Sequence, residues 1–186
     1  TSVGLMGAAA TVAGQNLGAG RPDRALGAIA ATSRLGLILA GSIGAAFLVL
    51  PGPLLGIFGM TDPRVLDMGV QLLRVLGVSG IFVTLALIHT GGLQGTGDTR
   101  SPFFISLVSQ VGVPLGTCLL LQYLRDGLEP LDIWLAILLG HVTRCVLSVV
   151  RFRQGKWRTI HVDIEPARAR EAARRAPTGF EPVAKR

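Results

Sequence analysis

Four stretches of this chain contain no charged residue, and each is long enough to cross a lipid bilayer. They cover residues 1–20, 35–61, 75–97 and 101–124. A transmembrane helix needs roughly 20 apolar residues to cross about 30 Å of hydrocarbon. Only 16% of the 186 residues are charged, whereas a soluble domain carries about 25%. Four such stretches in so short a chain predict a bundle of membrane-spanning helices.

A fifth apolar stretch covers residues 131–150. It is interrupted by Asp132, His141 and Arg144. Arg144 lies near the end of the stretch, where a long side chain can extend its charge to the membrane interface. We therefore expect residues 131–150 to form a further span.

Helices explain these stretches better than strands do. Strands of a membrane barrel are about ten residues long and alternate polar with apolar side chains, which residues 35–40 do not. We expect an all-α, polytopic transmembrane helix bundle over residues 1–152, consisting of the end of one helix and four further spans. A basic, disordered cytoplasmic tail is expected over residues 153–186.

The order of elements follows from the gaps in charge and from Gly, Pro and Asp signals at helix ends. We expect the end of a helix over 1–14, a turn over 15–24, an interfacial helical lead-in over 25–34, and spans over 35–58, 67–94, 102–124 and 131–150. Pro51 predicts a break near the end of the first complete span, and Pro114 predicts a kink in the third.

Lysine and arginine are distributed unequally between the two ends of these helices. Fourteen of the eighteen lie in residues 15–34, in residues 95–101 or from Arg151 onward. The opposite end carries Arg64, Arg74 and Arg125. The positive-inside rule makes the richer end cytoplasmic. The net charge of +7 is therefore explained by orientation in a lipid bilayer, and no nucleic-acid partner is expected.

Two glycine-rich loops separate apolar stretches. The first reads Gly14-Gln15-Asn16-Leu17-Gly18-Ala19-Gly20-Arg21-Pro22-Asp23-Arg24, and the second reads Gly95-Thr96-Gly97-Asp98-Thr99-Arg100-Ser101-Pro102. Glycine permits tight turns and the close approach of helices. A nucleotide-binding glycine loop would follow a strand within a βαβ unit, whereas long apolar helices flank both loops here. We expect the loops to fix where helices leave the membrane, with Asp98 capping the helix that follows it.

Polar side chains inside the spans are candidates for a transport path. At 100° per residue, Gln71, Arg74 and His89 lie on one face of their helix, and Gln110 lies on the polar face of the next. Polar groups in hydrocarbon face a bundle interior or a water-filled cavity. They also form interhelical hydrogen bonds worth about 0.6–2 kcal/mol, and both interpretations remain open for these residues. On the last helix, the aligned polar residues are His141, Arg144 and Ser148.

The acidic and reactive residues exclude several classes of function. All eleven acidic residues lie in loops, at helix ends or in the tail, whereas cation-coupled transporters usually hold their ion on a carboxylate within a span. The sequence has no nucleophile–base pair, metal-ligand spacing or phosphate-binding motif, so we expect neither an enzyme nor a bound metal or cofactor. Cys118 and Cys145 lie in apolar stretches and fit small core or lipid-facing positions.

The two loops resemble hallmark loops of the multidrug and toxic compound extrusion family. The resemblance rests on Gly14, Gln15, Gly18, Gly20 and Arg21 in the first loop and on Gly95, Gly97, Asp98, Thr99 and Arg100 in the second. Only two expected spans follow the second loop, so the chain is similar to part of the C-terminal lobe of a twelve-helix transporter. It matches the end of helix 8 and helices 9 to 12, which makes the N-terminal lobe of the same protein an expected partner.

This resemblance implies a multi-pass protein of the bacterial inner membrane that exports cationic or amphipathic compounds by alternating access, driven by Na⁺ or H⁺. The family's coupling carboxylates lie in the first, seventh or tenth helix. The helix that matches the tenth has only Asp67, at its outer edge, so the ion site is expected outside this chain. Two alternatives remain: a related flippase of lipid-linked oligosaccharides, which would need a cationic cavity, and a truncated membrane protein that does not transport.

Overall fold

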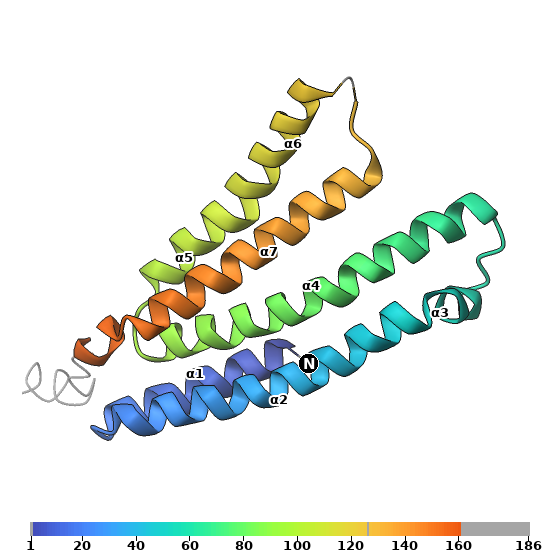
Figure 1. Cartoon of the computed structure of the whole chain (residues 1–186). Helices are drawn as coiled ribbons and strands as arrows, with labels where there is room; N and C mark the ends of the chain where they lie inside the picture. Colours follow the sequence, from blue (N-terminus) through green and yellow to red (C-terminus); the bar gives the residue numbers. More distant parts are fainter. Residues whose placement is uncertain (1, 126, 161–186) are drawn as a thin grey trace, which may run out of the picture.

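The computed structural model describes residues 2–125 and 127–160, and all regular secondary structure within these ranges is helical (Figure 1). The elements are α1 (Ser2–Gly18), α2 (Pro22–Val49), α3 (Pro51–Ile57), α4 (Pro63–Gly95), α5 (Arg100–Leu107), the π-helical η1 (Val108–Gly112), α6 (Val113–Leu124), α7 (Pro130–Arg153) and the 3-10 helix η2 (Lys156–Thr159). The expected all-α architecture is confirmed.

Four helical segments are long and apolar enough to cross a membrane. They are Pro22–Val49, Pro63–Gly95, Arg100–Leu124 and Pro130–Arg153. Large apolar side chains such as Leu39, Phe103 and Leu120 are exposed on their outer surfaces. Such surfaces are stable in hydrocarbon, where a helix satisfies all of its own backbone hydrogen bonds. The structure thus agrees with the expected polytopic membrane bundle.

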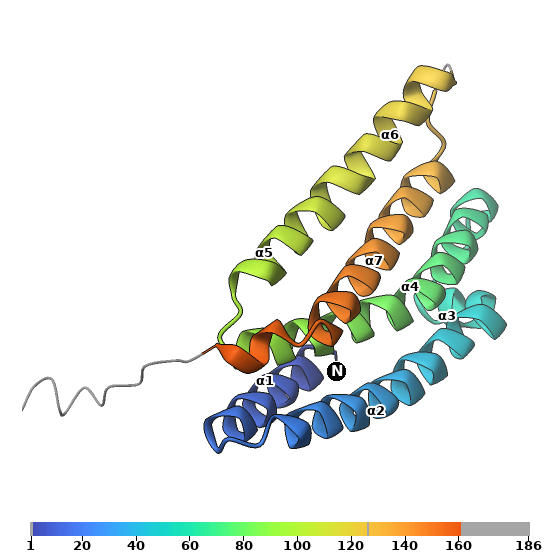
Figure 2. The ribbon, with the colours of Figure 1, turned by 60° about the vertical axis from the view of Figure 1, so that its left-hand side comes forward.

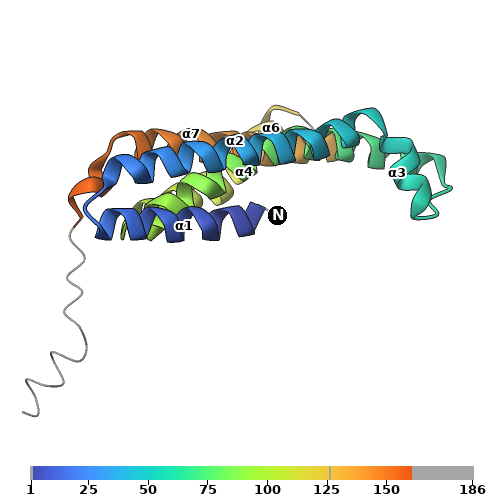
Figure 3. The same ribbon diagram turned by 90° about the horizontal axis from the view of Figure 1, so that it is seen from below.

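Helix α4 is the centre of the bundle. It packs against α1, α2 and α7, whereas α6 packs against α7 and η1. Figures 1 and 2 show the α5–α6 segment and α7 on one side of α4, and α1 and α2 on the other. Helix α1 is shorter than α2 and lies beside the half of it that is nearer the α1–α2 turn (Figure 3). The α1–α2 turn, the α4–α5 loop and η2 lie at the same end of the molecule (Figure 1).

Proline and acidic residues begin these helices. Pro22, Pro51 and Pro63 occupy the first turns of α2, α3 and α4, where the missing N–H of proline would have no helical acceptor. The side chain of Asp62 accepts hydrogen bonds from the backbone N–H groups of Arg64 and Val65. The expected break near Pro51 is confirmed, because α2 ends at Val49 and α3 begins at Pro51.

The first glycine loop is shorter than the sequence suggested. A turn was expected over residues 15–24, but α1 continues through Gly18 and α2 begins at Pro22. The helical lead-in expected over 25–34 is the first part of the continuous α2. The physical reason is that Gly14 serves helix packing and not chain reversal, since it lies against the backbone of Gly95.

The span formed by α5, η1 and α6 contains the irregularity expected near Pro114. A five-residue π-helical segment, Val108–Gly112, immediately precedes the first turn of α6, which contains Pro114. Proline removes one backbone donor and its ring crowds the preceding turn, and a π-helical turn within an α-helix is a known form of such an irregularity.

Packed structure continues past residue 152, the expected end of the bundle. Helix α7 ends at Arg153, and η2 brings the side chain of Trp157 into a buried position. Trp157 belongs to an apolar cluster that joins α1, α2, α4 and α7; its other buried members are Ala9, Ala13, Ala25, Ile29, Ile88, Leu93 and Phe152. Residues 161–186 of the expected tail lie outside the described residues.

Candidate functional site

Both glycine loops end their helices with the same backbone motif. Gly20 and Gly97 have φ angles of +69° and +92°, which glycine adopts without steric cost. The Gly20 N–H donates to the Leu17 carbonyl at 2.9 Å, and the next N–H, of Arg21, donates to the Asn16 carbonyl at 2.8 Å. The equivalent bonds in the second loop are Gly97 to Gln94, at 3.0 Å, and Asp98 to Leu93, at 2.9 Å. These paired bonds define a Schellman motif, which satisfies the last carbonyl groups of a helix.

Other glycines of the loops bring helices together. A Cβ atom on Gly14 would lie 2.6 Å from the carbonyl oxygen of Gly95, and a Cβ on Gly95 would collide with the carbonyl of Ala10. Small residues at such positions let membrane helices pack backbone against backbone. A Cβ on Gly18 would meet no neighbouring atom of the described residues within 4 Å. Gly20 and Gly97 therefore form turns, whereas Gly14 and Gly95 form the α1–α4 contact.

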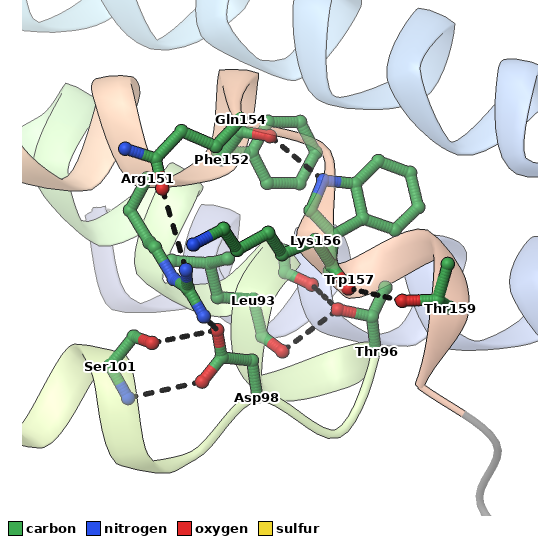
Figure 4. Close-up of polar contacts among 11 residues, drawn as sticks. Leu93, Thr96, Asp98, Ser101, Arg151, Phe152, Gln154, Lys156, Trp157 and Thr159 are labelled. Carbon is green, nitrogen blue, oxygen red and sulfur yellow. Dashed lines mark hydrogen bonds and ion pairs between the residues drawn. The ribbon is translucent and has the colours of Figure 1, made fainter.

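Asp98 connects the second loop to two helices (Figure 4). Its Oδ1 accepts the backbone N–H of Ser101 at 3.0 Å, and its Oδ2 accepts the Ser101 hydroxyl at 2.8 Å. The same Oδ2 accepts two bonds from Arg151 of α7, from Nε at 3.1 Å and from Nη2 at 2.8 Å. The bond to Ser101 confirms that Asp98 caps the first turn of α5.

The Asp98–Arg151 pair is largely withdrawn from solvent. The side chains of Asp98 and Arg151 are 6% and 26% exposed, respectively. Burial raises the pKa of the Asp98 carboxyl, but the hydrogen bonds from Ser101 and Arg151 lower it by more, so its pKa lies below the ordinary value. Asp98 is therefore ionised at neutral pH and forms charge-assisted bonds, which are stronger than neutral ones.

Trp157 supports this site from the end of α7 (Figure 4). Its indole Nε1–H donates to the Phe152 carbonyl at 2.8 Å, and the two rings stack with centroids 5.0 Å apart. Beside it, the hydroxyl of Thr96 donates to the carbonyls of Gly92 and Leu93. The second loop and the α7–η2 segment, which are distant in sequence, thus form one hydrogen-bonded and apolar junction.

The predicted path residues lie at different levels of the bundle. Gln71 donates to Asp67 at 3.1 Å, and Arg74 is exposed near the same end of α4. His89 Nδ1 lies 2.9 Å from the Leu85 carbonyl, and its ring meets Phe152 edge-on. Eighteen residues of helix separate Gln71 from His89, which corresponds to about 27 Å. The structure therefore does not gather these residues around one point.

Gln110 lies apart from the other three, in the π-helical segment η1. Its Nε2 atom is buried and has no hydrogen-bond partner among the described residues, and the same holds for His141 Nδ1 and Ser148 Oγ on α7. Leaving such buried polar groups without a partner is costly.

A pocket of about 230 Å³ lies between α1, α2, α4 and α7, and none of the four predicted path residues lines it. Its polar lining residues are Ser2, Ser79, Thr84 and His141. The hydroxyls of Ser2 and Thr84 are 2.9 Å apart. Of this group only His141 is a candidate from the sequence alone, because isolated Ser and Thr residues in a span give no distinctive signal.

Two further residues were missed as parts of the site. In the sequence Arg151 is one of the basic residues after the last span, and its partner Asp98 lies 53 positions earlier, so no local pattern connects them. Trp157 was assigned to the tail, although a large apolar side chain among basic residues was a usable signal for a packed segment.

The fold and the site define a multi-pass α-helical membrane protein whose glycine loops fix helix ends and helix crossings. The family model MatE matches residues 1–118, a range that contains both loops. The chain therefore belongs to the MatE family.

Several curated relatives are similar over most of this chain. A probable multidrug resistance protein NorM of Thermotoga maritima is 27% identical over 155 residues, which cover 83% of this chain and 33% of the relative. A multidrug resistance protein MdtK of Yersinia pestis is 30% identical over 149 residues, covering 78% of this chain and 32% of the relative. An MdtK of Yersinia pseudotuberculosis gives the same values. The chain spans about a third of the length of these relatives.

Proposed function

We propose that this chain is part of a multidrug efflux antiporter of the bacterial inner membrane that exports cationic and amphipathic compounds. The observation that carries the proposal is the MatE match over residues 1–118, which includes both glycine loops. The relatives NorM and MdtK are both named multidrug resistance proteins. The four long apolar helices provide a membrane-embedded scaffold for such a transporter.

In this proposal the chain supplies most of the C-terminal lobe, and an N-terminal lobe of the same protein supplies the other wall of a central cavity. Two lobes that rock against each other would give alternating access. The loop residues would act mechanically. Gly14 and Gly95 would hold α1 against α4, and the Asp98–Arg151 pair would hold the second loop on α7.

The end of the bundle that carries the glycine loops is proposed to be cytoplasmic. Arg21, Arg24 and Arg100 lie there together with the basic residues at the end of α7 and in η2. Excess Lys and Arg in short segments near helix ends marks the cytoplasmic side.

The driving ion is proposed to be Na⁺ or H⁺, bound outside this chain. In the described part of the chain, Asp67 lies in the outer part of α4, where it accepts the Gln71 amide, and Asp98 is paired with Arg151. A coupling carboxylate has to be free to bind and release its cation, which a carboxylate held by a salt bridge is not.

The proposal is tested by resistance in a bacterial host that lacks its own efflux pumps. The complete reading frame containing residues 1–186 is expressed beside residues 1–186 alone. The complete frame should raise resistance to cationic dyes severalfold, whereas residues 1–186 should not. A complete frame that reaches the membrane and gives no dye efflux would contradict the proposal, and resistance from residues 1–186 alone would contradict the need for a second lobe.

Ion coupling is tested in the same cells by ionophores. Ionophores dissipate the H⁺ gradient in one experiment and the Na⁺ gradient in another. Loss of the gradient that drives transport should abolish efflux of a fluorescent cationic dye within minutes. Efflux that survives the loss of both gradients would contradict coupling to either ion.

A further inference from the structure

A groove of about 430 Å³ runs between α5 and α7, near the end of the bundle that carries the glycine loops. Its polar lining comes from Arg100, Ser101, Arg151 and Gln154. Its apolar lining includes Phe104, Leu147 and Val150. The groove thus combines a cationic mouth with an apolar wall.

The two kinds of lining lie at matched depths. Helix α5 leads away from this end of the bundle and α7 returns to it (Figure 1). Phe104 lies four residues after Arg100, and Leu147 lies four residues before Arg151, so each apolar residue is about 6 Å farther along the helix than its arginine. On both helices the charge therefore lies at the end of the span and the apolar side chain lies one turn deeper.

The mouth of the groove carries a net positive charge. Arg100 is exposed and forms no ion pair with the described residues. Arg151 is partly neutralised by Asp98, whose two bonds also fix the position of the guanidinium. A guanidinium has five N–H donors in a planar fork that suits phosphate oxygens. Two of them bond to Asp98 and Nη1 donates to Gln154 Oε1 at 3.4 Å, so Arg151 retains donors for a second anion.

The apolar wall is accessible. Phe104 and Val150 are 61% and 48% exposed. A free inorganic anion would use the arginines and leave this wall uncovered, whereas an amphiphile would cover both. In a membrane, basic pockets between helices at the headgroup level bind anionic lipids.

We propose that this groove binds an anionic phospholipid of the surrounding bilayer. The phosphate lies between Arg100 and Arg151, and one acyl chain lies along Phe104, Leu147 and Val150. Such a lipid would cover the junction of α5 with α7 from the membrane side, at the point where Asp98 joins the same two helices. The test of this site does not depend on transport activity.

The test is native mass spectrometry of the purified protein in detergent, titrated with phosphatidylglycerol or with phosphatidylcholine of the same acyl chains. The wild-type protein should bind the anionic lipid more tightly, and Arg100→Gln should weaken that binding about fivefold, the effect of one arginine near a lipid headgroup. Arg64→Gln is the matched control, because Arg64 is an exposed arginine near the start of α4, at the opposite end of the bundle. Equal loss in both variants, or equal binding of the two lipids, would overturn the proposal.

The apolar half of the site is tested separately. Phe104→Ala leaves every charge in place and should weaken binding of both lipids severalfold. Millimolar inorganic phosphate should not displace the bound phosphatidylglycerol, because phosphate cannot cover the apolar wall. Displacement by phosphate, or unchanged binding in Phe104→Ala, would show that the groove takes an anion and not a lipid.

Discussion

The two glycine loops share one backbone motif but differ in how they are anchored. Gly20 and Gly97 end α1 and α4 with equivalent hydrogen bonds. After the second loop, buried Asp98 is held by Arg151 at 2.8 Å. After the first, Asp23 is 91% exposed and lies 3.9 Å from Arg158. The two loops are thus similar in sequence, but only the second is held to another helix by a buried ion pair.

This difference indicates which helix junctions move together. A buried, multiply hydrogen-bonded ion pair holds its partners in one geometry, whereas an exposed pair at 3.9 Å contributes little. The α4–α5 junction is therefore fixed to α7, and the α1–α2 junction is held mainly by its own turn and by helix packing. In a transporter whose lobes reorient, we expect the first loop to change its position relative to α7 more easily than the second.

The largest expected effect comes from Trp157, which supports both loops through the shared apolar cluster. Trp157→Ala should lower the free energy of unfolding by about 3–5 kcal/mol, as large-to-small core substitutions do. Thermal unfolding in detergent measures the change. Trp157→Phe keeps a ring against Phe152 and loses one hydrogen bond, so it should cost only about 1 kcal/mol. A tolerated Trp157→Ala would contradict a packed role for η2.

The next effect separates a glycine at a helix contact from a glycine at an open helical position. Gly95→Ala puts a Cβ against the Ala10 carbonyl and should cost about 3 kcal/mol, because helix backbones must move apart. Gly18→Ala, at an open helical position, should stay within about 0.5 kcal/mol of wild type. The same thermal unfolding assay compares them, and equal effects would mean that the α1–α4 contact is not close.

A third comparison removes one carboxylate charge from each loop. Asp98→Asn leaves Arg151 partly buried without its counter-charge and should cost about 2 kcal/mol. Asp23→Asn should cause no measurable change. Both variants are compared by thermal unfolding at neutral pH and low salt, where ion pairs are least screened. A larger loss of stability in Asp23→Asn than in Asp98→Asn would contradict the claim that the second loop is the one held by an ion pair.

Acid should weaken the second loop selectively. The pKa of the Asp98 carboxyl is lowered in the folded protein. Ionised Asp98 therefore contributes its full stabilisation of the fold above its pKa in the unfolded chain, about 3.9, and this contribution is lost as pH falls through its pKa in the folded protein. Wild-type protein should therefore lose more thermal stability than Asp98→Asn when pH falls from 5 to about 3. Parallel pH profiles of the two proteins would contradict an ionised, paired Asp98.

The spans and several helix ends could be predicted from the sequence because their signals are local. Uncharged stretches set the spans, Pro51 set the break after α2, and Asp98 was correctly expected to cap α5. The length of the first loop was not predictable, because a glycine that makes a helix contact, such as Gly14, has the same sequence signal as one that makes a turn. The partner of Asp98 was not predictable either, because it depends on how α7 packs beside α5.

The most direct test of the anchoring account is a double-mutant cycle on the pair. Asp98→Asn, Arg151→Gln and the double variant are compared with wild type by thermal unfolding in detergent. The account predicts a coupling energy of at least about 1 kcal/mol, within the range of residues in contact, and no measurable coupling between Asp23 and Arg158. Additive effects at Asp98 and Arg151 would contradict the claim that this pair holds the second loop on α7.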